Sequence, residues 1–328
     1  MRSSLALRLL PFIGLAAAQT NTTQPSEPEI VAMLQGMANG FRSYPIAPLM
    51  HWPDEEGLQY ENVYFPADDG VTIEGWFIPS NGSNKVIIAN HPRWFNRAGL
   101  PGVEPWNALV PGNDWEVNFI PDYKLLHDAG YNVLAYDLRN HGQSGNGNNG
   151  LYTSGHYESR DVIGSINYIR NRKDTKNMNI GLFSRCNGAN SNLHAIRLKP
   201  QVFEGIKGMV AVQPLSAKSF MTRALEGRGV PLSYLDDLDE RVYLQTSFHI
   251  DQLTPTPSAK FVKMPTFMYQ VYADYMTSPD DVQAIFDNIP IEDKTLYWIN
   301  GTDKRWDGYT WFQENPDQVL NWLSRHMA

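Results

Sequence analysis

The chain has 328 residues, of which 42% are hydrophobic and 19% charged, so it is long and apolar enough to bury a sizeable core. Its net charge of −8 argues against a nucleic acid or an anionic membrane surface as the main partner. The single cysteine, Cys186, excludes an intrachain disulfide and a multi-cysteine metal site. We expect no cofactor and no metal.

The first residues are typical of a secretory signal peptide. A short basic start at Arg2 is followed by a mostly apolar segment, and three small residues end at Ala18. The segment is too short to span a membrane. We therefore predict a signal peptide over residues 1–18, an N-terminal extension over 19–60, and a secreted or lumenal mature chain without a membrane span.

Three triplets of the type Asn-x-Ser/Thr fit that compartment. They begin at Asn21, Asn81 and Asn300, and each is an acceptor sequence for N-glycosylation. We therefore predict a glycoprotein.

From residue 61 onward, compact β-type runs alternate with amphipathic helical segments. The first two strands, 62–66 and 71–79, are separated by Asp68-Asp69-Gly70, which indicates a hairpin. Further strands are predicted over 86–89, 133–137, 179–183, 206–212, 266–271 and 295–299. Helices are predicted over 122–127, 157–170, 187–198 and 280–288, with a last helix that ends near Arg325. This order predicts an α/β fold with a mostly parallel eight-stranded sheet covered on both faces.

The alternation is interrupted after the sixth strand. About fifty residues between Pro214 and Pro265 contain no clear strand. We expect this insert, residues 215–264, to form a helical cap above the carboxyl edge of the sheet, within a single domain over 61–328.

The junction after the fifth strand carries the clearest chemical signal. It reads Ser184-Arg185-Cys186-Asn187-Gly188, in the place of a Gly-x-Ser-x-Gly nucleophile elbow between a strand and a helix. Small residues stand two positions before and after the central residue, because the turn is too tight for bulk there. A thiolate at a helix N-terminus beside Arg185 is favoured by the helix dipole and by the cation, so Cys186 is the predicted nucleophile.

With this elbow, the sequence resembles the α/β-hydrolase superfamily over essentially all of its length after about residue 60. Asp137-Leu-Arg-Asn-His141-Gly-Gln-Ser144 is similar to the loop that follows the fourth strand of that family, and Asn90-His91-Pro92 lies where the family has its oxyanion loop. The cysteine at the elbow resembles the dienelactone hydrolases. Some fungal tailoring hydrolases and acyl transferases have the same fold.

The resemblance implies roles for several residues. The N–H of Asn187 and one N–H of the loop His91–Arg93 would form the oxyanion hole. Asp274, after the strand that follows the cap, would be the acidic member of a triad. The histidine is missing, because the loop 300–309, where the family places it, contains none, and Lys304 or Arg305 is nearest to its position.

Other histidines are therefore candidates for the proton carrier. His91 is the nearest by sequence logic, and His249 in the cap is an alternative. His141 is expected to be structural.

These observations predict a hydrolase or acyl transferase that uses a cysteine nucleophile on an ester, thioester or lactone of an apolar small molecule. The resemblance adds natural-product biosynthesis as a plausible setting. The alternative is a non-covalent protein on the same scaffold, which binds a ligand or steers a cyclisation or rearrangement without hydrolysis.

Overall fold

The computed structural model describes residues 25–42 and 45–328. The predicted signal peptide and the Asn21 triplet lie outside the described residues. Within those ranges, no helix is long and apolar enough to cross a membrane. The side chains of Asn81 and Asn300 are exposed, and their glycosylation stays a prediction.

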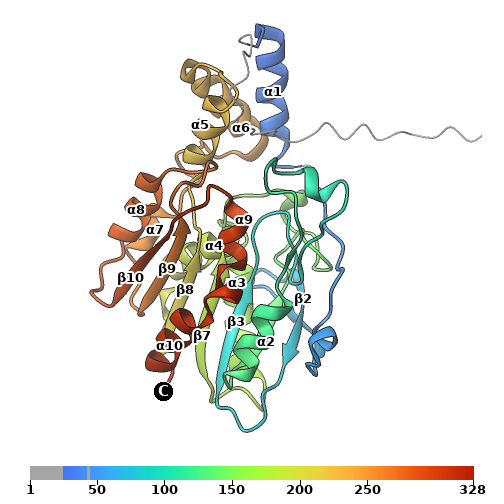
Figure 1. The fold of residues 1–328 in the computed structure, drawn as a ribbon, viewed down its shortest axis with the longest axis vertical. Helices are drawn as coiled ribbons and strands as arrows, with labels where there is room; N and C mark the ends of the chain where they lie inside the picture. Colours follow the sequence, from blue (N-terminus) through green and yellow to red (C-terminus); the bar gives the residue numbers. More distant parts are fainter. Residues whose placement is uncertain (1–24, 43–44) are drawn as a thin grey trace, which may run out of the picture.

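An eight-stranded sheet forms the centre of the molecule, with the order β1-β2-β6-β3-β7-β8-β9-β10 (Figure 1). Its strands are β1 (Glu61–Pro66), β2 (Thr72–Ile78), β3 (Lys85–Asn90), β6 (Asn132–Tyr136), β7 (Asn179–Arg185), β8 (Gly208–Val212), β9 (Thr266–Val271) and β10 (Lys294–Ile299). The strand β2 is antiparallel to both of its neighbours, and the strands from β6 to β10 pair in parallel. The predicted fold class and the predicted hairpin at the start of the sheet are confirmed.

Helices cover both faces of the sheet, because the strands are apolar on both sides. One face carries α2 (Ile120–Asp128), α9 (Arg305–Glu314) and α10 (Pro316–His326), whose buried side chains join one core cluster. The other face carries α3 (Ser159–Asn171), α4 (Asn187–Leu198) and α8 (Pro279–Asp287), which join a second cluster.

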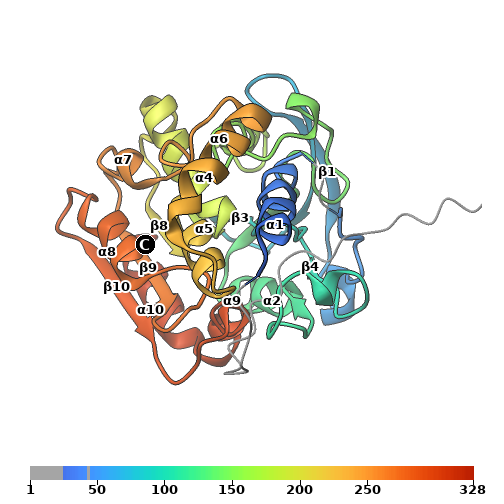
Figure 2. The same cartoon turned by 90° about the horizontal axis from the view of Figure 1, so that it is seen from above.

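The cap follows the sixth strand of the sheet, β8, as predicted. It contains α5 (Ala217–Glu226), α6 (Leu235–Thr246) and the short α7 (Thr256–Ala259). In Figures 1 and 2, α5 and α6 lie beyond one end of the sheet, together with α1 (Glu27–Asn39). A third core cluster joins α1 to the cap, with Leu34 of α1 and Leu238 of α6 both fully buried.

The helix α1 of the N-terminal extension therefore packs on the cap, which the sequence analysis did not predict. At the start of α1, the N–H and the hydroxyl of Ser26 both donate to the carboxylate of Glu29, and the helix packs an apolar face against α6. Three other elements were missed, namely two short strands and the start of a helix. The long connection after β3 contains the small hairpin β4 (Gly99–Leu100) and β5 (Val117–Asn118), and α9 begins at Arg305 inside the segment that was predicted to be a loop.

Candidate active site

Cys186 lies at the turn between β7 and α4, as predicted. Its backbone has φ 49° and ψ −109°, a conformation that is strained for a residue with a side chain. The turn is held by the N–H of Cys186, which donates to the oxygen of Val212 at 2.7 Å, and by the N–H of Gly188, which donates to the oxygen of His91 at 3.2 Å. The second bond ties the elbow to the loop after β3.

Gly188 is required by this close approach. A Cβ atom at position 188 would stand 1.9 Å from Oδ1 of Asn90, well inside van der Waals contact. At the other small position, the hydroxyl of Ser184 is buried and accepts a hydrogen bond from Asn192 at 2.7 Å. The local pattern of the elbow is thus explained by its packing.

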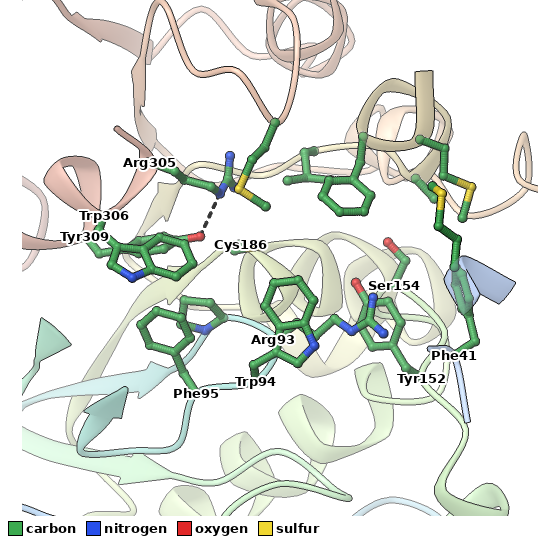
Figure 3. Close-up of a pocket in the computed structure, with 17 residues that line it drawn as sticks. Phe41, Arg93, Trp94, Phe95, Tyr152, Ser154, Cys186, Arg305, Trp306 and Tyr309 are labelled. Atoms are coloured by element: carbon green, nitrogen blue, oxygen red, sulfur yellow. Dashed lines mark hydrogen bonds between the residues drawn. The ribbon is translucent and has the colours of Figure 1, made fainter. Parts of the chain in front are cut away.

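Cys186 opens into a pocket between the sheet edge and the cap (Figure 3). Most of the wall is aromatic or contains methionine, and the aromatic residues come from five regions. Phe41 follows α1, Trp94 and Phe95 follow β3, Tyr152 precedes α3, Phe220 lies on α5, and Trp306 and Tyr309 lie on α9. A cavity of this composition suits an apolar ligand with a few polar contacts.

The first N–H groups of α4 point to the elbow and have no acceptor within the helix. The N–H of Asn187 therefore has the expected position for an oxyanion donor, and this role stays a prediction. Pro92 lines the pocket, but it has no N–H, so a second donor must come from the residues after it. Arg93, the next residue, also lines the pocket.

Arg185 lies elsewhere than the sequence analysis expected. Its guanidinium is fully buried, forms an ion pair with Asp122 of α2, and stacks over the ring of Phe119 at 4.1 Å. It does not line the pocket, and its charge is compensated by Asp122. Arg185 is therefore a core cation on the α2 face of the sheet, and its pairing with Asp122 argues against the predicted support of the thiolate.

The geometry also argues against His91 as the proton carrier. Its Nδ1 pairs with the oxygen of Pro92 at 2.7 Å, and its Nε2 accepts from the N–H of Leu138 at 2.9 Å. Burial lowers the pKa of His91 to about 3, so the ring is neutral with both nitrogens engaged. His91 orients the loop after β3. Its neighbour His141, whose ring centroid is 5.1 Å away, is likewise buried and lies in the structural loop after β6.

His249 is not an alternative base in this structure. It is half exposed on the cap, where its Nδ1 pairs with Asp239 at 2.7 Å and its ring stacks on Tyr243. Among the described residues that line the pocket, none is a histidine.

Asp274 occupies the position expected for the acid, and its partner is Arg305. The two side chains are both about 1% exposed and form an ion pair through Oδ2 of Asp274. The other carboxylate oxygen accepts from the N–H of Met276 at 2.9 Å. Arg305 thus stands where the sequence places the missing histidine, but as a permanent cation it cannot take a proton.

Tyr309 is the residue that the sequence analysis missed. Nε of Arg305 donates to its hydroxyl at 2.8 Å, and Tyr309 lines the pocket beside Cys186 (Figure 3). The two residues are four positions apart on α9, so their contact is the ordinary i, i+4 contact of a helix. A helix predicted from Arg305 onward would have revealed it.

The comparisons with known proteins support the fold. No family model matches the sequence, and no curated protein matches it. Among solved structures, an esterase from Pyrococcus furiosus matches with a TM-score of 0.63 and 23% identity over 87% of this chain and 100% of its own.

Two further solved structures have a similar fold. The α/β hydrolase GrgF from a Penicillium species has a TM-score of 0.56 and 17% identity, and covers 82% of this chain and 99% of its own. A dienelactone hydrolase from Anabaena variabilis has a TM-score of 0.50 and 12% identity, and the match covers 83% of this chain and 99% of its own. The chain therefore has the α/β-hydrolase fold.

Proposed function

We propose that the protein is an enzyme that forms a thioester between Cys186 and the acyl group of an apolar ester, thioester or lactone. The observation that carries this proposal is the placement of Cys186, whose strained backbone directs the thiol into an aromatic pocket at the N-terminus of α4. The structural neighbours described as an esterase and as hydrolases support acyl chemistry on this fold.

In this mechanism the sulfur of Cys186 attacks the carbonyl carbon, and the N–H of Asn187 stabilises the oxyanion. The leaving group departs, and water or another acceptor then attacks the thioester. Both hydrolysis and acyl transfer follow from this scheme. We extend the proposal to a secreted enzyme of natural-product tailoring, supported by the apolar pocket and by the N-terminal sequence.

The experiment that tests the proposal uses intact-protein mass spectrometry. The purified chain is mixed with p-nitrophenyl butyrate, and we expect a mass increase of one butyryl group on Cys186 together with a burst of p-nitrophenolate. Cys186→Ala should show neither signal. Unmodified Cys186 in the folded wild-type protein would exclude the covalent mechanism.

A second candidate is favoured by one specific observation, namely the pocket without a described histidine. A non-covalent protein of this fold would bind its ligand, or steer a rearrangement, through the pocket shape and the charge of Arg305. The Cys186→Ala variant separates the two candidates, because only the non-covalent protein would keep its activity on the natural ligand.

A further inference from the structure

The covalent mechanism needs a group that moves the proton of the thiol, and α9 brings two polar side chains to the pocket near Cys186. These are Arg305 and Tyr309. In Figure 3 the hydroxyl of Tyr309 lies on the side of the ring that faces Cys186, and a dashed line joins it to the side chain of Arg305, which is drawn above it.

Arg305 is held in place from several sides. Beyond its ion pair with Asp274, it donates through Nη2 to the backbone oxygen of Gln213, and Nε2 of Gln213 donates to the backbone oxygen of Arg305 at 2.8 Å. The nearby acidic groups of Tyr309, Asp274 and Cys186 outweigh the effect of burial and raise the pKa of Arg305, so it stays charged. Its position and its charge are therefore constant features of the pocket.

The contact with Arg305 determines what the hydroxyl of Tyr309 can do. Because Nε of Arg305 donates to this oxygen at 2.8 Å, the hydroxyl hydrogen must point to another acceptor. Cys186 lines the same pocket on the side that this hydroxyl faces (Figure 3). Burial, and to a lesser extent the interaction with Cys186, raises the pKa of Tyr309 well above its usual value, so the group is a neutral hydroxyl that can both donate and accept.

We propose that the hydroxyl of Tyr309 carries the proton for Cys186, in the place that a histidine has in related folds, and that Arg305 and Asp274 position this hydroxyl. The inference rests on the proposed function, because it concerns the same acyl transfer. Tyr309 is a catalytic residue in this scheme, since its hydroxyl exchanges protons with the reacting sulfur, whereas Arg305 and Asp274 are positioning residues.

The proton balance closes without a charged tyrosine. During acylation, the S–C bond forms as the S–H proton passes to the oxygen of Tyr309, and the hydroxyl proton of Tyr309 passes to the leaving atom as its bond to carbon breaks. In the second half, the proton of the incoming water, alcohol or thiol passes to Tyr309, and the hydroxyl proton returns to sulfur. Each half-reaction returns Tyr309 to its neutral form.

The test compares two butyrate esters whose leaving groups differ in basicity. The more basic leaving group depends more strongly on proton donation when its bond to carbon breaks. Phenyl butyrate releases a basic phenolate, and p-nitrophenyl butyrate releases a stable anion. Single-turnover acylation of Cys186 is followed by mass spectrometry for the wild type, Tyr309→Phe and Tyr269→Phe. Tyr269 is a matched control, because it is a fully buried tyrosine of the same core cluster that does not line the pocket.

We expect Tyr309→Phe to slow acylation by phenyl butyrate by about 100-fold or more, which is the usual range for the loss of a general acid or base. The decrease in acylation rate with p-nitrophenyl butyrate should be clearly smaller, and Tyr269→Phe should leave the acylation rates of both substrates unchanged. Replacement of Tyr309 by 3-fluorotyrosine keeps the ring and the hydroxyl and should change the ratio of the two rates, so the proposal stays testable if Tyr309→Phe folds poorly.

The role of Tyr309 would be overturned if wild-type Cys186 is acylated but Tyr309→Phe slows acylation equally for the two substrates, or does not slow it. The proposed function would then stay intact. The absence of any acyl adduct on wild-type Cys186 would overturn both.

Discussion

At the scale of single residues, the site differs from a catalytic triad at one position, where an arginine stands in place of the expected histidine. Asp274 stands where the acid of a triad is expected, but it faces an arginine, and the two form a fully buried ion pair. Breaking such a pair leaves an uncompensated charge in the core, whereas removing both charges does not. The Asp274–Arg305 pair is therefore also a structural element of the pocket wall.

This reasoning predicts the outcome of a double-mutant cycle. Arg305→Met should lower the free energy of unfolding by about 3–5 kcal/mol, because Asp274 is left buried and charged. Adding Asp274→Asn removes that charge and keeps an acceptor for the N–H of Met276, so the double variant should be more stable than Arg305→Met alone. Urea unfolding measures all four proteins, and strictly additive losses would contradict the coupling.

At the scale of elements, α1 is the feature that connects the N-terminal extension to the site. Leu34 is fully buried against the cap, and Phe41, just after the helix, lines the pocket. Arg93 of the pocket wall donates to the backbone oxygen of Gly40 and stacks over the ring of Tyr152 at 4.0 Å. One wall of the pocket therefore depends on how α1 docks.

We predict that Leu34→Ala loosens this wall. The lost burial should weaken the docking of α1 by about 2–5 kcal/mol. Hydrogen exchange in α1 should become faster, and so should alkylation of Cys186 by iodoacetamide, because the pocket opens more often. Val31→Ala is the matched control, since Val31 lies on the same helix and is 38% exposed. Equal protection of α1 in both variants would show that the helix does not depend on this contact.

At the scale of the whole molecule, a histidine pair joins the cap to the α/β core. His156 precedes α3, His194 lies on α4, and their rings stack with centroids 3.9 Å apart. The cap contacts the pair from the other side, with the ring of Phe248 5.0 Å from His156 and the oxygen of Gln252 2.8 Å from its Nε2. Burial lowers the pKa of both histidines, so both rings are neutral in the folded protein.

The lowered pKa values predict a pH dependence of stability. In the unfolded chain these histidines bind protons below about pH 6.5, where the folded protein does not yet bind them. Their contribution to stability is therefore complete above that pH and is lost as the pH falls through the folded-state values, by up to about 1.4 kcal/mol per pH unit for each group. The His156→Phe variant keeps an aromatic ring at the stacked position and removes one of the two titratable imidazoles.

The measurement is the free energy of unfolding of the wild type and of His156→Phe at several pH values between 7.5 and 5. We expect a smaller loss of stability on acidification in the variant. An identical slope for the two proteins would show that His156 is not protonated on unfolding in this range.

The sequence by itself determined the fold and the position of the elbow turn at Cys186, because both depend on local patterns. The alternation of strands and helices, the hairpin at Gly70, the insert after the sixth strand and the tight turn with a small residue on each side of Cys186 are all readable over short stretches. The elements were recovered with small differences at their ends, and the helix after the elbow was predicted with its observed bounds.

Only the tertiary structure decided which side chains surround Cys186. The pairing of Asp274 with Arg305, the placement of Tyr309 and Cys186 in one pocket, the engagement of both nitrogens of His91, and the place of α1 in the pocket wall are all set by packing between distant parts of the chain. No periodicity records such contacts, since they depend on the relative placement of whole elements. The lone cysteine was evident from the composition, but the candidate for its proton became visible only when α9 was seen to begin at Arg305.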